Sequence, residues 1–411
     1  MTSSFSTALS ALNADTTAIS VVGNNLANLN TDGFKASELS FNDLMSQSMG
    51  ASAQTQVGFG VGTPVTLLQF TQGALQNTGS ALDAAIQGNG FFIVQGQTGQ
   101  TEYTRGGSFE TNAQGELTTA TGEFVQGWNT TNGALNTNVP TSNVVIPTGS
   151  LQAPVATTST SVSLNLDASA GAGTSFSTSI TAYDSLGNSH VVTYTFTQSG
   201  TPYQWNYSMS FPDGDLTAPG TPATGTLTFN SNGDLVSPAA TDAQPVLTAT
   251  GLSDGAADMN ITWNLYNTSG ATITQFAQPS ATSAMTQNGE PAANLTSVGI
   301  ANGGQIVAQY SNGQQMVVGQ MAMANISNPE SLIVAGDNNY TLGANTAIPA
   351  VGLPSTGGRG TVTGGSVESS TVDIATEFTH LIVYQRSYEA NARMVTTLDQ
   401  LSQDTIGIIQ Q

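Results

Sequence analysis

Residues 22–35 read VGNNLANLNTDGFK and join a helical pattern to a long β-rich chain. Upstream of this stretch, residues recur at alternating spacings of four and three, which is the heptad pattern of a helix with one contact face. The seam positions are Phe5, Leu9, Leu12, Thr16, Ile19, Gly23 and Leu26. Within the stretch, residues 30–33 end in Gly33, which adopts positive φ at little cost and is typical of a helix stop. We therefore expect an amphipathic helix over residues 3–29, followed by a sharp turn.

The other end of the chain carries the second long helical pattern, from about residue 372 to residue 411. Its seam is Ile374, Phe378, Leu381, Gln385, Tyr388, Ala392 and Val395, and it then shifts phase to Met394, Leu398, Leu401, Thr405 and Ile408. Two seams predict a coiled coil between the ends, although such a pattern equally fits packing on the helix's own domain or on another copy of the chain. The residues predicted to self-associate are Phe5, Leu9, Leu12, Ile19, Leu26, Ile374, Phe378, Leu381, Tyr388, Val395, Leu398 and Leu401.

The region between the helical patterns consists of short alternating runs separated by Gly, Asn and Asp turns, which is typical of antiparallel barrels or sandwiches. Passages at Pro140–Pro154 and Pro279–Pro291 mark boundaries. The predicted fold class is a mainly β multidomain chain with α-helical termini, in which an outer antiparallel β domain is inserted into a discontinuous inner one. The predicted domains are a coiled-coil domain of 1–30 with 367–411, connecting segments 31–72 and 354–366, an inner β domain of 73–150 with 282–353, and an inserted outer β domain of 151–281.

The charge of the chain is strongly one-sided. Five Lys and Arg residues stand against 26 Asp and Glu residues, which gives a formal net charge of -21 over 411 residues. The five cations are Lys35, Arg105, Arg359, Arg386 and Arg393. No Lys or Arg lies between Arg105 and Arg359, so the middle of the chain cannot form a basic patch. We therefore expect neither nucleic acid nor anionic lipid as a partner. Repulsion between like-charged copies also predicts that salt promotes self-assembly.

The N-terminal sequence has neither the basic n-region nor the continuous apolar core of a cleavable signal peptide. No apolar run approaches the length that spans a bilayer, and we expect no membrane insertion. The chain has no cysteine, so its fold uses no disulfide or thiolate metal site. The absence of cysteine does not fix the compartment, but it fits a protein that is exported unfolded and needs no oxidation afterwards. If the protein leaves the cell, a non-classical or dedicated apparatus must carry it.

Candidate catalytic and metal-binding residues are few. The two histidines, His190 and His380, fall in segments that we assign to different domains, so a shared site is not expected. Asp184–Asn188 and Asp213–Asp215 carry oxygens that fit calcium, but neither matches the twelve-residue calcium loop, and ordinary turns explain both better. No nucleophile elbow or phosphate loop is present. The sequence therefore predicts a structural or interaction protein with no catalytic residue, metal or cofactor, rather than an enzyme.

The terminal motifs resemble those of the bacterial flagellar rod–hook–hook-associated axial family. The first motif is Asn24-Asn25-Leu26-Ala27-Asn28 with Gly33-Phe34-Lys35, and the second is Gln385-Arg386 with Tyr388-Glu389-Ala390-Asn391. Between the ends, LDAAIQGNGFF, EYTRGGSF, ITAYDSLGNSH and VVGQMAMANISNPESLIVAGDNNY are similar to hook subunits specifically. The scarcity of cations departs from the family and bears on its subunit–subunit salt bridges rather than on the fold.

The resemblance implies a structural subunit that self-assembles into the tubular hook, a flexible joint that transmits motor torque from rod to filament. It also implies terminal helices that pair around an export channel, and we expect these helices to be disordered in the free subunit and to fold on assembly. The implied partners are further copies of the chain, the hook cap, the distal rod and hook–filament junction proteins, and the flagellar type III export apparatus. The implied location is the hook of the flagellum, outside the cell.

Two alternatives remain beside the hook interpretation. A distal rod or hook-associated subunit shares the terminal motifs and differs in its position along the flagellum. A surface carbohydrate-active β-protein would need a pocket in which carboxylates and aromatic side chains converge.

Overall fold

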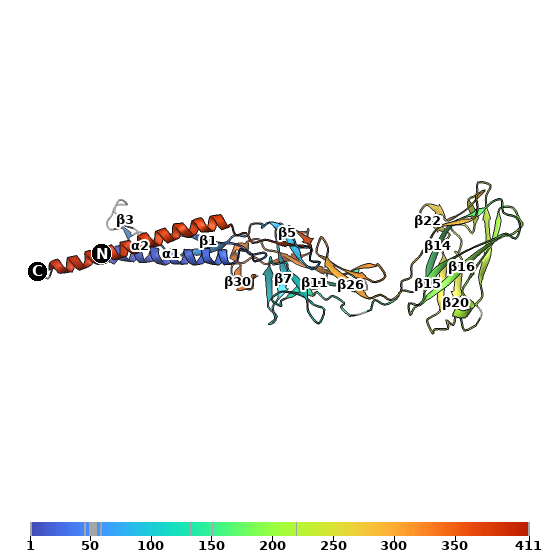
Figure 1. Cartoon of the computed structure of the whole chain (residues 1–411), viewed down its shortest axis with the longest axis horizontal. Helices are drawn as coiled ribbons and strands as arrows, with labels where there is room; N and C mark the ends of the chain where they lie inside the picture. The colour runs from blue at the N-terminus through green and yellow to red at the C-terminus, as the bar shows by residue number, and fades with distance from the viewer. Residues whose placement is uncertain are drawn as a thin grey trace. The chain divides into compact units, whose positions relative to one another are not determined.

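The structure, a computed structural model, describes residues 2–44, 47–48, 56–57, 60–131, 134–149, 151–218 and 220–409 (Figure 1). The chain divides into two compact units. Unit 1 comprises Met1–Thr148, Ser297–Ala308 and Gln315–Gln411, and unit 2 comprises Gly149–Thr296 and Gln309–Gln314. Strands dominate between the two long helices at the ends of the described chain. The predicted fold class is thus confirmed.

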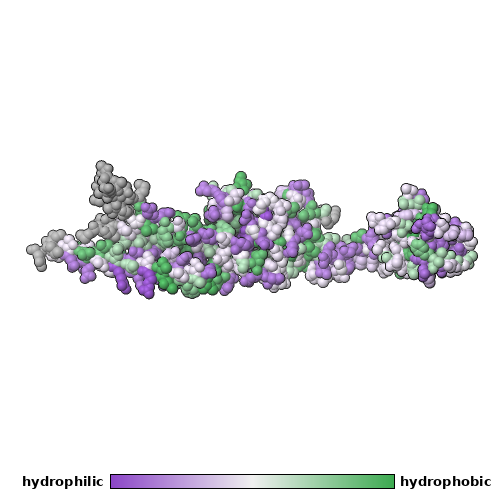
Figure 2. Space-filling model, turned by 90° about the horizontal axis from the view of Figure 1, so that it is seen from above, coloured by the Kyte–Doolittle hydropathy of each residue, from purple (hydrophilic) through white to green (hydrophobic). Residues whose placement is uncertain are grey.

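The two helices of unit 1 are α1, Thr2–Ala27, and α2, Ile374–Ile409, and they lie side by side (Figure 1). This pairing confirms the predicted association of the chain ends. Apolar patches, green in Figure 2, lie among hydrophilic ones on the surface of the helical part. The expected coiled-coil domain starts at residue 367, whereas α2 begins at Ile374, because Ser366–Glu368 are paired in a strand.

One 14-stranded sheet forms the main body of unit 1. Its strands are β7 (Phe91–Gln95), β8 (Thr101–Thr104), β9 (Phe109–Thr111), β10 (Leu117–Thr119), β11 (Phe124–Thr131), β12 (Ala134–Leu135), β13 (Ser142–Asn143), β26 (Leu295–Ile300), β27 (Gln305–Tyr310), β28 (Gln315–Met321), β29 (Met323–Asn325), β30 (Ile333–Gly336), β31 (Asn339–Thr341) and β32 (Ala350–Gly352). The central order is β26-β27-β28-β11-β7-β8-β31-β30. In this order, β11, β7 and β8, which precede unit 2 in the chain, lie between strands that follow it, and Trp128 of β11 lies opposite Gln320 of β28.

Short ladders complete unit 1. They are β1 (Ser37–Ser40) with β4 (Val65–Leu68), β2 (Gln47–Ser48) with β3 (Gln56–Val57), β5 (Leu75–Asn77) with β34 (Ser366–Glu368), and β6 (Ala84–Gln87) with β33 (Thr361–Gly364), beside the short helix η3 (Pro329–Ser331). Strands β33 and β34 therefore occupy the end of the connecting segment expected at 354–366. Gly364 lies against the backbone of Ile300, where a side chain would not fit, and Gly365 turns the chain with a φ of 68°. These glycines permit close packing rather than disorder.

Unit 2 contains two five-stranded sheets. The first has β14 (Ser159–Asp167), β20 (Val246–Ala249), β21 (Met259–Trp263), β24 (Ile273–Phe276) and β25 (Ala281–Gln287). The second has β15 (Ser175–Tyr183), β16 (Ser189–Gln198), β17 (Gln204–Ser210), β18 (Ala223–Phe229) and β19 (Leu235–Ser237), and the ladder β22 (Tyr266–Asn267) with β23 (Gly270–Ala271) and the turn η2 (Asp213–Asp215) lie outside both. One departure from the expected antiparallel order is that β14 runs parallel to β21 and β24.

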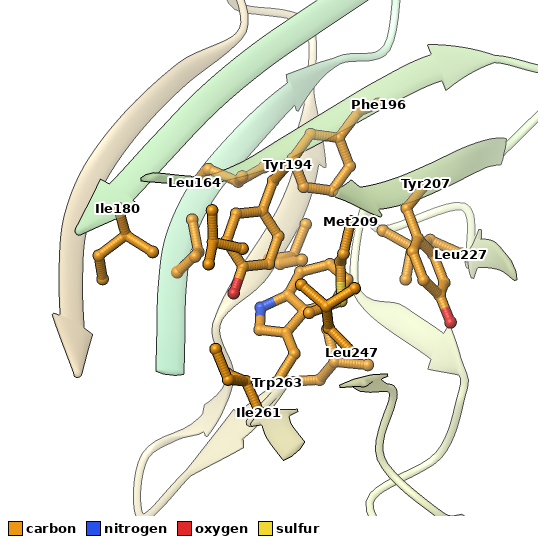
Figure 3. Packing of buried hydrophobic residues seen from close by; sticks show 14 of the residues in the cluster. Leu164, Ile180, Tyr194, Phe196, Tyr207, Met209, Leu227, Leu247, Ile261 and Trp263 are labelled. Atoms are coloured by element: carbon orange, nitrogen blue, oxygen red, sulfur yellow. The ribbon is translucent and has the colours of Figure 1, made fainter. Parts of the chain in front are cut away.

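The core of unit 2 lies between its two sheets (Figure 3). Trp263 is fully buried, with ring centroids 5.2 Å from Tyr194, 5.8 Å from Phe196 and 5.3 Å from Tyr207. The Tyr194 hydroxyl lies 2.6 Å from the Thr160 hydroxyl, and burial raises the pKa of this tyrosine to about 12. The alternation of buried and exposed residues along the strands places the large apolar side chains inside.

The two chain segments that begin and end unit 2 pair with each other. Antiparallel bridges join Gln152 to Ala293 and Val155 to Glu290. The Val155 N–H donates to the Glu290 carbonyl at 2.9 Å, and the Glu290 N–H donates back at 2.8 Å. Unit 2 therefore starts and finishes as a two-stranded ribbon.

Candidate assembly surfaces

The contact face of α1 carries small and polar side chains. Buried positions recur seven residues apart, at Ala8, Asp15 and Val22 and again at Ala18 and Asn25. Small side chains let two helices approach closely, because little volume separates the backbones. The buried heptad of α1 thus lies one residue before the predicted seam, and two of its members, Asp15 and Asn25, contact α2.

A buried carboxylate lies in the middle of the helix contact. Asp15 is 6% exposed, and its Oδ2 atom accepts hydrogen bonds from Ser387 Oγ at 3.1 Å and from Asn391 Nδ2 at 2.9 Å. Two neutral donors compensate part of the cost of removing the charge from water. This arrangement gives a role to Asn391 of the C-terminal motif and fixes the register of α2 on α1.

Asn25 of the N-terminal motif joins three segments. Its side-chain amide donates to the Ser37 carbonyl at 2.8 Å and to Glu377 Oε1 at 2.9 Å, and its Oδ1 accepts the Ser37 N–H at 3.0 Å. Asn25 is 1% exposed. Because the amide satisfies both polar groups of Ser37, α1 is fastened to β1 and to α2 at one point.

The predicted self-association residues differ in how exposed they are. Six of them are exposed: Phe5, Leu9, Ile374, Phe378, Tyr388 and Leu401. The other six are half-buried: Leu12, Ile19, Leu26, Leu381, Val395 and Leu398. Further exposed apolar side chains on α2 are Ile382, Val383, Met394 and Ile406. Large apolar side chains gathered on exposed helix faces mark an interaction surface.

A buried ion cluster lies where the helices meet the strands. Lys35 Nζ lies 2.6 Å from Glu368 Oε1 and donates to the Thr71 carbonyl at 2.6 Å. Arg105 Nη1 lies 3.2 Å from Glu368 Oε2. Burial lowers the pKa of Lys35 and of Arg105, and the Glu368 carboxylate opposes that effect. Two of the five cations of the chain therefore converge on one buried acid.

The backbone around the ion cluster explains the Gly-Phe-Lys motif. Gly33 has a φ of 70°, and any side chain there would collide with the Arg105 backbone. The Gly33 N–H donates to the Glu368 carbonyl at 2.6 Å, and the Thr371 N–H donates to the Phe34 carbonyl at 3.1 Å. The segment after α1 thus runs beside the segment before α2. We name Lys35, Arg105 and Glu368 the junction cluster.

The remaining motif residues have more local positions. Asn28 Nδ2 donates to the Asn24 carbonyl at 2.9 Å, and Thr31 Oγ1 donates to Asn28 Oδ1 at 3.1 Å, which closes the end of α1. Ala27, Gln385 and Arg386 are exposed, and Phe34 is half-buried. Sequence reasoning missed Glu368 and Asp15. The only sequence feature that pointed to Glu368 was indirect: Lys35 and Arg105 are rare cations in this chain, and if buried they would need an acidic partner.

Among the described residues, no helix combines the length and the apolar character needed to cross a membrane.

Family models of flagellar proteins match most of the chain. The flagella basal body rod protein model matches residues 5–35, and the flagellar basal body rod FlgEFG protein C-terminal model matches residues 363–408. The flagellar hook protein FlgE/F/G D1 domain model matches residues 85–166, and the flagellar basal body protein FlaE D2 domain model matches residues 150–290. The models thus match both helical ends and strands of both units.

Similar proteins cover nearly the whole chain. The flagellar hook protein FlgE of Escherichia coli K12 is 33% identical over 98% of this chain and 99% of its own length. That of Treponema pallidum is 31% identical over 95% of this chain and 96% of its own. The crystal structure of Helicobacter pylori flagellar hook protein FlgE2 covers 70% of this chain and 99% of its own, with a TM-score of 0.52 and 15% identity, and shows the fold alone.

Together with these matches, the paired terminal helices and strand-rich units identify a structural subunit of the bacterial flagellum. This class agrees with the predicted absence of a catalytic role, since the matching family is a structural one. The chain belongs to the flagellar hook protein FlgE family.

Proposed function

We propose that this chain polymerises into the flagellar hook through the outward apolar faces of α1 and α2. The observation that carries the proposal is that different residues of the helices form the contact within one chain and the exposed apolar faces. Polar residues such as Asp15 and Asn25 join the two helices of one chain, while Leu9 and Phe378 stay exposed. Burying the exposed half of a large apolar side chain against another copy contributes about 1 kcal/mol. Many such contacts overcome the repulsion between copies that each carry a net charge of -21.

The polymer formed in this way is a tubular, flexible joint that transmits torque from rod to filament. Its partners are the hook cap, the distal rod and hook–filament junction proteins, and the flagellar type III apparatus that exports the subunit to the outside of the cell. Support for these partners comes from family membership. A joint must bend, and the weakly charged surface of the subunit supports sliding between copies, because few ion pairs fix one register. We propose no catalytic role.

A double variant on α2 tests the assembly surface. Phe378→Ser with Ile382→Ser changes two exposed residues one helical turn apart. We expect the polymer fraction measured by sedimentation and electron microscopy to fall sharply, because copies lose apolar contact, while circular dichroism of the dilute chain is unchanged. Ile348→Ser is the matched control, since Ile348 is 93% exposed in unit 1 outside the helices. Equal polymerisation of the double variant and the control would refute the proposal.

A distal rod or hook-associated subunit is the second candidate function. The observation that favours this alternative is the names of two family models. The models that match residues 5–35 and 363–408 are both described as basal body rod proteins. Immunogold labelling along isolated flagella separates the candidates. Label confined to the hook supports the hook subunit, and label confined to the rod or to the hook–filament junction supports the alternative.

A further inference from the structure

A cluster of metal-ligating side chains lies in unit 2. His190 on β16 is 5% exposed, and Asp184 in the turn before β16 is fully buried. His190 Nε2 lies 3.1 Å from Asp184 Oδ2 and 3.6 Å from Asp254 Oδ2. The three ligand atoms lie within 4.8 Å of one another. Donors bound tetrahedrally to one zinc ion are about 3.3 Å apart, so small adjustments bring all three into a coordination shell.

The second nitrogen of the same ring is held by a third carboxylate. His190 Nδ1 lies 2.8 Å from Asp215 Oδ2, in the turn η2. A carboxylate that accepts the Nδ1–H bond orients the ring and selects the tautomer whose Nε2 lone pair is free for a metal. The lone pair then faces Asp184 and Asp254. This carboxylate–histidine arrangement is the support that metal-bound histidines commonly have.

Asp184 is also fixed in place. Its Oδ1 atom accepts the N–H groups of Leu186 at 2.8 Å and Asn188 at 2.9 Å, which leaves Oδ2 directed toward His190. Asn188 Nδ2 lies between the two carboxylates, 3.3 Å from Asp184 Oδ2 and 3.1 Å from Asp254 Oδ2. The hairpin turn between β15 and β16 thus holds the Asp184 carboxylate in place, and Asn188 of the same turn contacts Asp254.

The negative charge of the cluster is only partly balanced by His190. Three carboxylates converge on one imidazole, and residues 106–358 contain no Lys or Arg that could approach them. Even with a protonated imidazole the four groups sum to a charge of -2. A divalent cation bound to a neutral imidazole removes more of this negative charge than a proton does.

We propose that Asp184, His190 and Asp254 form a zinc site in unit 2, with Asp215 as the positioning residue. The imidazole ligand favours Zn²⁺ over Ca²⁺ and Mg²⁺, which prefer all-oxygen sites. A water molecule completes the fourth position. The metal would link the β15–β16 turn to the loop that carries Asp254 and so stiffen unit 2. The inference does not depend on the proposed polymer contacts, because it concerns unit 2 alone.

The test uses the full chain, freed of metal with a chelator. Cobalt(II) chloride is the spectroscopic probe and zinc chloride the competitor. We expect one Co²⁺ per chain with the intense visible absorption of a four-coordinate site, displacement by Zn²⁺, and a rise in the melting temperature of about 5 °C with saturating Zn²⁺. His190→Gln is expected to abolish the absorption and the thermal shift. His380→Gln, which changes the other histidine of the chain, is expected to retain both.

Asp254→Asn provides a second variant in case the core does not tolerate loss of His190, because the Asp254 side chain is 26% exposed. It is expected to weaken Co²⁺ binding at least tenfold with unchanged circular dichroism. The absence of four-coordinate absorption in the folded wild-type chain overturns the proposal. So does wild-type absorption that persists in the Asp254 variant, or that disappears equally in His380→Gln.

Discussion

The helix pair of unit 1 and the sandwich of unit 2 use apolar side chains in opposite ways. Unit 2 encloses its large residues, and Trp263 and Phe196 are fully buried. The helices enclose alanines and an aspartate, while Phe378 and Leu401 are exposed. Most of the stability of an amphipathic helix comes from packing its apolar face. The comparison therefore separates a unit that completes its core within one chain from a helix pair whose apolar face is exposed and, in the proposed assembly, packs against further copies.

The largest expected effect is on the enclosed core. Trp263→Ala removes an aromatic side chain that touches three other rings and is expected to destabilise unit 2 by about 4 kcal/mol. Urea unfolding followed by circular dichroism measures the change. Val236→Ala, at an exposed site in the same unit, is the control and is expected to have little effect. Similar losses for both variants would show that unit 2 does not depend on an enclosed core.

The junction cluster gives the next largest expected effect. Glu368→Gln leaves the buried Lys35 and Arg105 without their carboxylate and is expected to destabilise unit 1 by about 3 kcal/mol. Glu389→Gln, an exposed change of the same type on α2, is the control and is expected to stay within about 0.5 kcal/mol. Denaturant midpoints of the two variants provide the comparison. A midpoint for Glu368→Gln equal to that of the control contradicts the structural role of the cluster.

Ionic strength distinguishes contact between copies from folding within a copy. Raising salt from about 0.01 M to about 0.15 M shortens the Debye length from about 30 Å to about 8 Å. Because each copy carries a net charge of -21, the polymer fraction is expected to rise, while the urea midpoint of unit 2 changes little. Light scattering and sedimentation report the polymer. A polymer fraction that does not change with salt would show that charge repulsion between copies does not limit polymerisation.

The smallest expected effect on the stability of the isolated chain is at Leu9. This variant separates contact between copies from packing within one copy most clearly. Leu9→Ser changes an exposed residue of α1 and is expected to alter the free energy of unfolding of the dilute chain by less than about 0.5 kcal/mol. Its loss of about 1 kcal/mol of contact between copies is expected to raise the critical concentration for polymerisation about fivefold. A large loss of stability in the dilute chain would mean that Leu9 packs within one copy.

Much of the architecture was predictable from local sequence. The heptads of the ends and the turn at Gly33 depend on residues near one another, so they can be recognised without a fold. The choice of heptad stripe could not be predicted in the same way. Leu9 has the pattern of a contact residue, yet it is exposed, while Asp15 and Asn25 make polar contacts with α2.

The polar sites depended on long-range pairing and were therefore hidden. Glu368 lies 333 positions from Lys35 along the chain, and only the fold brings their charged atoms to 2.6 Å. Asp184 and Asp215 were interpreted as separate turns, while the fold places His190 between them. The residue types show that these side chains can form ion pairs or bind a metal. The sequence alone does not show which of them lie close together in the fold.

The ribbon formed by residues 152–155 with 290–293 has a practical consequence for engineering. Opposed residues of an antiparallel pair have Cα atoms about 5 Å apart, so the chain leaves and re-enters at almost one point. A foreign domain whose own ends lie close together meets that geometric demand without stretching the linkers. A binding domain could therefore be inserted at this ribbon in place of unit 2. If the chain polymerises as proposed, each subunit would then carry one such domain, and the domains would be regularly spaced along the polymer.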